Sequence, residues 1–239
     1  MDLSDPTRSV TPTLDGAVLA VLASAGRPLT VGQVAQLAAR GSEIGIRRSL
    51  GRLVEQGTVR ATMMGRNQVH ELNRDHVAAR VAEVLAGLRT ELWSRFRREL
   101  ESWQPRPLMA VVFGSAARGD GGVDSDIDLL LVHPPFAGEP DFGEDLPCGE
   151  RLPHALGAAL MGEKDPKARD RWATHVEGLY GLVERWTGNS LQVVDLSYAE
   201  WRRPHESHLP LLAAVAAEGI ELRKARGLRL LPPVAVNHA

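Results

Sequence analysis

The sequence predicts a mixed α/β (α+β) chain, in which a small helical N-terminal domain and a C-terminal domain with a mixed β-sheet flanked by helices are joined by a long helix. Three observations carry this prediction. Helix signals and a hairpin pattern fill residues 1–74, one unbroken helical period fills residues 75–104, and apolar strand-like runs alternate with helical stretches over residues 105–239. A chain of 239 residues is long enough for two domains with separate cores.

Composition excludes several classes of protein. Hydrophobic residues make up 44% and charged residues 24%, which is unlike a disordered chain, and no apolar run approaches the ~18 residues of a membrane span. Residues 1–10 lack the apolar core of a secretory signal, so we expect a cytoplasmic protein without a membrane partner. The single cysteine, Cys148, cannot form an intrachain disulfide and has no neighbouring base, so we interpret it as incidental.

The N-terminal domain begins with three short helices. The first is predicted over residues 14–25. Thr30 and Gln33 have the spacing of a capping box, in which each side chain satisfies a free backbone N–H of the first turn, and this starts a second helix. The third helix begins near Ser42 and ends at Gly57.

A hairpin follows the third helix, with strands over residues 58–62 and 68–72 around a turn at residues 65–67. Three short helices and a hairpin are typical of a winged helix. That fold resembles the helix-turn-helix DNA readers, whose recognition helix enters the major groove of double-stranded DNA. The candidate DNA-binding residues are Arg47, Arg48 and Arg52 on the third helix and Arg60 and Arg66 on the hairpin.

The charge balance restrains the DNA-binding hypothesis. Residues 1–75 hold nine Lys and Arg against seven Asp and Glu, which is a small basic excess. Winged helices also mediate protein contacts, and surface arginines on a helix are usually just solvated. Both interpretations of this domain therefore stay open.

Apolar residues follow a helical period almost without interruption from residue 75 to about residue 103. The predicted linker helix is about 40 Å long, at ~1.5 Å per residue. Packing along the second domain is one interpretation of its apolar side, and a homodimer through this linker helix is the other. Pro105 and Pro107 end the helix and mark the domain boundary.

The strongest motif lies at the start of the C-terminal domain. A buried strand over residues 108–113 is followed by Gly114-Ser115, and ten residues later Asp126-Ile-Asp128 leads into a second apolar strand. A glycine after a strand lets the backbone approach a phosphate, and Ser115 offers hydroxyl and N–H donors. Asp126 and Asp128 lie two residues apart on one strand, so they point to the same face and suit Mg²⁺.

This pattern, Gly114-Ser115 followed by Asp126-Ile-Asp128, resembles the motif of the DNA polymerase β-like nucleotidyltransferase superfamily, in particular its minimal nucleotidyltransferases. The resemblance extends over residues 107–222 and implies a nucleotidyltransferase domain. It implies transfer of a nucleoside monophosphate, with ATP as the expected donor, to an acceptor hydroxyl with release of pyrophosphate. Gly114 and Ser115 would hold the triphosphate, and Asp126 and Asp128 would ligate Mg²⁺, with Mn²⁺ as a substitute.

The same resemblance implies a third catalytic and metal-ligating carboxylate on a neighbouring strand. Asp195, in an apolar strand-like run after a helix over residues 166–186, is the candidate. Three carboxylates would suit two metal ions. Arg118 either adds a positive charge over the phosphates or pairs with Asp120. Residues 133–150, rich in proline, glycine and acid, are predicted as a loop beside the site.

Two functions from different classes follow from these patterns. The first is a nucleotidyltransferase, an enzyme that transfers a phosphorus-containing group to a small molecule, a protein or an RNA. The second is a DNA-binding transcription regulator or antitoxin-like protein, whose nucleotidyltransferase domain senses nucleotide without turnover. Salt-dependent duplex binding would favour the second.

Overall fold

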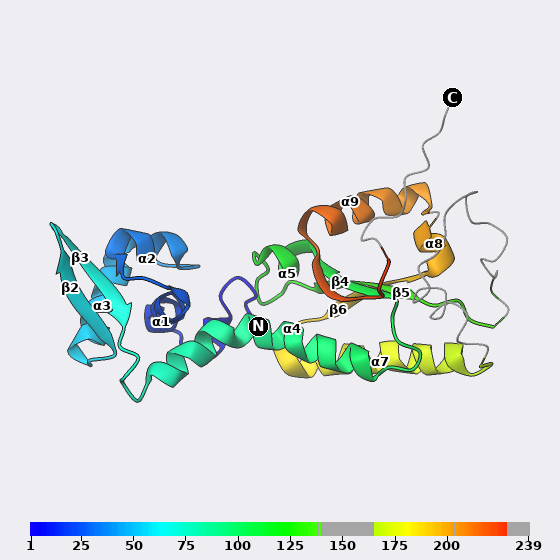
Figure 1. The fold of residues 1–239 in the computed structure, drawn as a ribbon, viewed down its shortest axis with the longest axis horizontal. Helices are drawn as coiled ribbons and strands as arrows, with labels where there is room; N and C mark the ends of the chain where they lie inside the picture. Colours follow the sequence, from blue (N-terminus) through cyan, green and yellow to red (C-terminus); the bar gives the residue numbers. More distant parts are fainter. Residues whose placement is uncertain (138, 140–164, 203, 229–239) are drawn as a thin grey trace, which may run out of the picture. The chain divides into compact units, whose positions relative to one another are not determined.

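The computed structural model describes residues 1–137, 139, 165–202 and 204–228. Cys148 and most of the predicted loop over residues 133–150 lie outside the described residues. The chain divides into two compact units, Met1–Leu92 and Trp93–Ala239, and the division falls within helix α4, Ala79–Ser102 (Figure 1). Among the described residues, no helix is both long and apolar enough to cross a membrane.

The first unit combines three helices with a small antiparallel sheet of order β1-β3-β2. The elements are α1 (Leu14–Ser24), β1 (Leu29–Thr30), α2 (Val31–Leu37), α3 (Glu43–Glu55), β2 (Val59–Met64) and β3 (Asn67–Leu72). The capping box of Thr30 and Gln33 is confirmed, since each side chain accepts from the other residue's backbone N–H. Ser42 caps α3 by accepting from the Gly45 N–H.

The segment before α1 packs into this unit through a short helix that was not predicted from the sequence. Leu3 and Asp5 are buried, and a short 3₁₀ helix, η1 (Pro6–Ser9), follows. The Asp5 carboxylate accepts from the Thr7 N–H and forms an ion pair with Arg40, so its buried charge is compensated. Arg89 on α4 donates to the carbonyl oxygen of Leu3 and so ties α4 to this segment.

The second unit contains a four-stranded sheet of order β6-β5-β4-β7. Strands β5 and β6 are parallel and the other pairs are antiparallel, so the sheet is mixed as predicted. Its elements are β4 (Met109–Phe113), α5 (Gly114–Arg118), β5 (Ile127–His133), α7 (Ala168–Thr187), β6 (Leu191–Ser197), α8 (Tyr198–Arg202), a 3₁₀ helix η2 (Glu206–His208), α9 (Leu209–Glu218) and β7 (Ile220–Lys224).

Helices cover the two faces of this sheet differently. Figure 1 shows α5, α8 and α9 on one side of the sheet and α7 on the other. On the α9 side, Val111 and Leu130 from the central strands pack against Trp201, Leu212 and other apolar side chains of α8 and α9. Because successive side chains of a strand point to opposite faces, this core fixes which residues of each strand face α9.

Candidate active site

The turn between β4 and α5 brings backbone close to a carboxylate. Gly114 has φ of +68°, in the left-handed region that favours glycine. A Cβ atom added at Gly114 would collide with the Asp128 carboxylate, whose Cγ lies 3.3 Å from that position. Gly114 is thus required both for the backbone conformation and for the close approach of the turn to Asp128.

Asp126 and Asp128 flank the first residue of β5 and sit next to this turn. Asp128 is paired with Phe113 across the antiparallel β4–β5 ladder. It shares its face with Leu130, which belongs to the apolar core under α9. Asp126 is exposed and Asp128 is half-buried, so the pair lies at the edge of the core where a ligand from solvent can reach it.

The electrostatics of the pair suit a cation. Burial raises the pKa of the Asp128 carboxyl, and the neighbouring Asp126 carboxylate raises it further, while Arg118 acts in the opposite direction. Two carboxylates that repel each other in a partly desolvated position are what a divalent cation neutralises, and hard oxygen ligands suit Mg²⁺. The residues present therefore fit a metal ion, although the described part of the chain gathers no group of three or more metal-ligating side chains.

Asp195 does not join the pair, and the expectation of a third ligand there needs correction. In the parallel β5–β6 ladder Asp195 lies opposite Leu131, whereas the residue opposite Asp128 is Gln192. Leu131 and Asp128 point to opposite faces because they are an odd number of residues apart. The Asp195 Oδ2 atom accepts from the Trp172 Nε1–H of α7 at 2.8 Å, which places this carboxylate on the α7 side of the sheet.

Arg118 pairs with Asp120, while its other predicted role, a positive charge over the phosphates, stays a prediction. Its Nε donates to Asp120 Oδ2 at 3.0 Å, and its Nη1 donates to Glu218 Oε1 at 2.8 Å. These hydrogen bonds raise the pKa of the Arg118 guanidinium. Its charge is therefore engaged by two carboxylates beside the turn.

Two residues at this end of the sheet were not predicted from the sequence. Glu218, the last residue of α9, also accepts from the Gly114 N–H at 3.2 Å. Asn189, in the turn before β6, is buried, and its Nδ2 donates to the carbonyl oxygens of Gly122, Val123 and Ser125. No local signal could have found them, because each acts on a segment more than 60 residues away in sequence.

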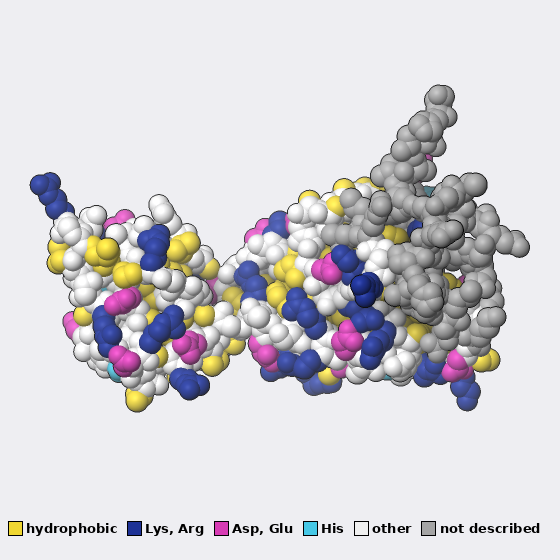
Figure 2. Space-filling view, in the orientation of Figure 1, with side chains coloured by type: hydrophobic (Ala, Val, Ile, Leu, Met, Phe, Trp, Pro, Cys, Tyr) yellow, Lys and Arg dark blue, Asp and Glu magenta, His cyan; other side chains and the backbone are white. Residues whose placement is uncertain are grey.

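The arginines proposed for DNA binding are exposed, but three of them have acidic partners. Arg47 pairs with Glu43 on its own helix, Arg52 with Asp15 and Arg60 with Asp75. On the face in view in Figure 2, basic side chains of the first unit are interspersed with acidic ones. Arg48 and Arg66 are the two candidates for which the described residues show no ion pair.

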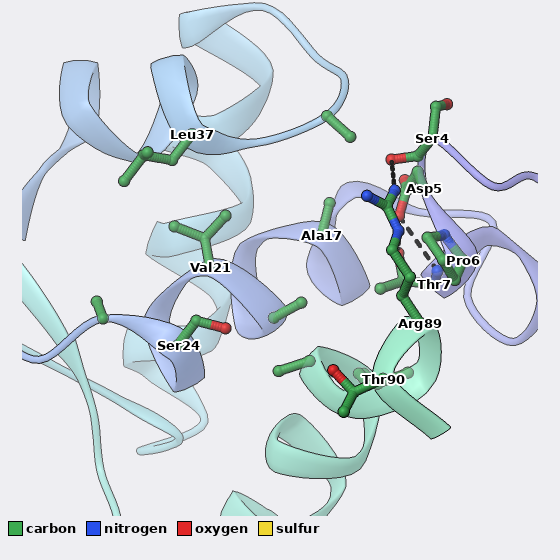
Figure 3. A pocket seen from close by; sticks show the side chains of 15 residues that line it. Ser4, Asp5, Pro6, Thr7, Ala17, Val21, Ser24, Leu37, Arg89 and Thr90 are labelled. Atoms are coloured by element: carbon green, nitrogen blue, oxygen red, sulfur yellow. Dashed lines mark hydrogen bonds between the residues drawn. The ribbon is translucent and has the colours of Figure 1, made fainter. Parts of the chain in front are cut away.

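A hollow of about 520 Å³ lies within the first unit (Figure 3). Ala17 and Val21 of α1 line it, together with Arg89 of α4 and the segment around Asp5. Residues proposed from the sequence for catalysis, metal or DNA do not line it.

Fold and site together define an α/β domain in which a tight glycine turn faces an aspartate on the neighbouring strand of a mixed sheet. The comparison with family models agrees, because residues 93–177 match the model described as a nucleotidyltransferase domain. This match supports nucleotidyl transfer as the general activity of that part of the chain. It contains Gly114, Ser115, Asp126 and Asp128 and ends before Asp195 and Glu218. No curated protein matches the chain.

Proposed function

We propose that the second unit transfers a nucleoside monophosphate from a nucleoside triphosphate, with ATP as the expected donor, to an acceptor hydroxyl. The observation that carries this proposal is the close approach of the Gly114 turn to Asp128, whose neighbour two residues earlier is Asp126. The turn would present the Ser115 hydroxyl and backbone N–H to phosphate oxygens, and the two carboxylates would hold Mg²⁺, or Mn²⁺ in its place. The metal would supply positive charge against the triphosphate.

The reaction balances without any further reagent. The acceptor oxygen forms a bond to the α-phosphorus, the bond from that phosphorus to the bridging oxygen breaks, and pyrophosphate leaves with the electron pair. The acceptor proton passes to solvent. The acceptor is a hydroxyl-bearing small molecule, protein or RNA.

Calorimetric titration of Mg·ATP tests this proposal. The wild-type protein is expected to bind, and the variant with both Asp126→Ala and Asp128→Ala is expected to lose binding. Asp165→Ala is a suitable control, since that exposed carboxylate pairs with Arg171 away from the turn. Failure of the wild-type protein to bind Mg·ATP or Mn·ATP would overturn the proposal.

Double-stranded DNA is the partner we propose for the first unit, with Arg48 and Arg66 as the main phosphate contacts and Arg47, Arg52 and Arg60 as secondary ones. The support is the exposed position of Arg48 on α3 and of Arg66 at the tip of the β2–β3 hairpin. In the regulator version of this proposal, nucleotide binding biases DNA binding without turnover. Duplex binding that weakens steeply with salt and is reduced by Arg48→Ala would support it, and indifference to any duplex would exclude it.

We also propose a homodimer through the linker helix. Val81 and Val84 in the first turns of α4 are 57% and 65% exposed, and Val77, two residues before the helix, is 91% exposed. An exposed apolar stripe at helical spacing is typical of a helix that pairs with another helix. Light scattering should show a dimer that Val81→Glu with Val84→Glu converts to a monomer, and a monomeric wild-type protein would contradict the proposal.

A further inference from the structure

One carboxylate at the end of α9 holds the turn that faces the aspartate pair. Glu218 Oε1 accepts from the Gly114 N–H at 3.2 Å and from Arg118 Nη1 at 2.8 Å. The Glu218 side chain is only 21% exposed, so this oxygen is largely withdrawn from solvent. Partial burial strengthens both hydrogen bonds, because less water competes for the donors and the acceptor.

Gly114 is held from two sides. Its N–H is bound by Glu218, and its Cα faces the Asp128 carboxylate so closely that there is no room for a Cβ atom. The position of Glu218 therefore sets the distance between the turn and the carboxylates. Helix α5, which follows the turn, has only five residues and cannot fix this position by itself.

A second observation shows that the placement of Glu218 is built into the fold. Gly219, the next residue, ends α9 and begins the approach to β7. A Cβ atom at Gly219 would collide with the Val215 carbonyl and would come within 2.6 Å of Val111 Cγ1 on β4. The absence of a side chain at Gly219 thus lets the end of α9 pack directly against the strand that leads into Gly114.

We propose that Glu218 is a positioning residue for the donor nucleotide: it clamps the Gly114 turn at the spacing from Asp126 and Asp128 that a metal-bound triphosphate requires. This inference rests on the proposed function and extends it to a residue outside the matched region. Glu218 acts through the Gly114 backbone and Arg118 and makes no contact with the reacting atoms.

The clamp also explains why a carboxylate is tolerated so near a phosphate site. Arg118 lies between Glu218 and Asp120 and offsets their charge. What the turn needs from Glu218 is an acceptor oxygen at the end of a side chain of this length. Reach should therefore matter more than negative charge.

Three substitutions separate reach from charge. Glu218→Gln keeps the acceptor and loses the charge, Glu218→Asp keeps the charge and is one methylene shorter, and Glu218→Ala loses both. Calorimetry with Mg·ATP should show binding within about 3-fold of wild type for Glu218→Gln, and about 10-fold weaker binding for Glu218→Asp and Glu218→Ala. Glu221→Ala is the matched control, because Glu221 lies three residues further on and pairs with Lys224.

Two further measurements distinguish a clamp from a general loss of structure. The melting temperature of Glu218→Gln should match that of the wild type, and amide exchange at Gly114 should accelerate in Glu218→Asp but not in Glu218→Gln. Equal or tighter Mg·ATP binding by Glu218→Asp and Glu218→Ala would overturn this role alone. A wild-type protein that binds no Mg·ATP would overturn the proposed function, and this role with it.

Discussion

The two faces of the C-terminal sheet carry the same chemical group in different settings. On the α9 face, Asp128 lies beside Asp126 and the Gly114 turn, and burial and its neighbour raise its pKa. On the α7 face, Asp195 accepts a hydrogen bond from the Trp172 indole. Asp128 on β5 and Asp195 on β6 differ in the face of the sheet to which their side chains point. Strand register therefore decides whether an aspartate can take part in a metal site.

The largest expected effect separates these two aspartates by metal-nucleotide binding. Asp128→Asn should weaken Mg·ATP binding by ~1,000-fold, about 4 kcal/mol, because the substitution removes the negative charge of a carboxylate proposed to bind Mg²⁺. Asp195→Asn should leave binding within ~3-fold, since its side chain faces the other way. Calorimetry on both variants makes the comparison. Equal losses would mean that β6 takes another register when nucleotide is bound.

A substitution at Asn189 tests what holds strands β5 and β6 in register. Its buried amide donates to three carbonyl oxygens of the loop before β5, and Asn189→Ala would leave these acceptors unsatisfied. We expect a loss of about 2–3 kcal/mol in the free energy of unfolding, measured with urea. Ser190→Ala, at an exposed neighbouring position, should be close to neutral. An unchanged free energy of unfolding for Asn189→Ala would show that these hydrogen bonds do not hold the loop before β5 to the turn before β6.

Gly114→Ala tests the close approach on the α9 face. The left-handed backbone and the collision with Asp128 should together cost about 1–2 kcal/mol of unfolding free energy. The cost should be smaller when Asp128 is also changed to Ala, because the collision is then removed. Gly122→Ala is the control, since a Cβ there meets nothing within 4 Å. An additive double mutant would show that the strain lies in the backbone alone.

The smallest expected effect concerns stability and pH. Because the pKa of Asp128 is raised in the folded protein, the folded state binds a proton more readily than the unfolded state, and stability falls as pH rises from 3.8 through the raised value. Without metal, Asp128→Asn should therefore become more stable than wild type above this window, by less than about 1 kcal/mol because the pair is partly exposed to solvent. Urea unfolding of the wild type and of Asp128→Asn at pH 4 and pH 7 measures this difference. A stability difference that does not grow with pH would contradict the raised pKa of Asp128 and the burial and repulsion that cause it.

The features that the sequence predicted correctly have local causes. Thr30 and Gln33 are three residues apart, so their capping box follows from local spacing. The fold class followed from such signals, and the mixed sheet flanked by helices is confirmed.

What could not be predicted depends on contacts between distant segments. The face of Asp195 is set by the register between β5 and β6, and the role of Glu218 by a hydrogen bond that spans 104 residues. Strand β1 has only two residues, too few for any periodicity, and exists because β3 supplies its partners. The sequence shows that residue 195 is an aspartate, but it does not show the face of the sheet to which Asp195 points.

The side-chain amide of Asn189 connects the turn before β6 to the loop before β5, next to the point where the two parallel strands begin to pair. This connection constrains how the sequence of the domain can change in evolution. Insertion or deletion of one residue between Asn189 and Asp195 would flip the later side chains of β6 and carry Asp195 to the face of Asp128. The Trp172 indole would lose its acceptor in the same event. A third metal ligand could thus be gained or lost in evolution through a change in the length of this segment alone, without substitution of any acidic residue.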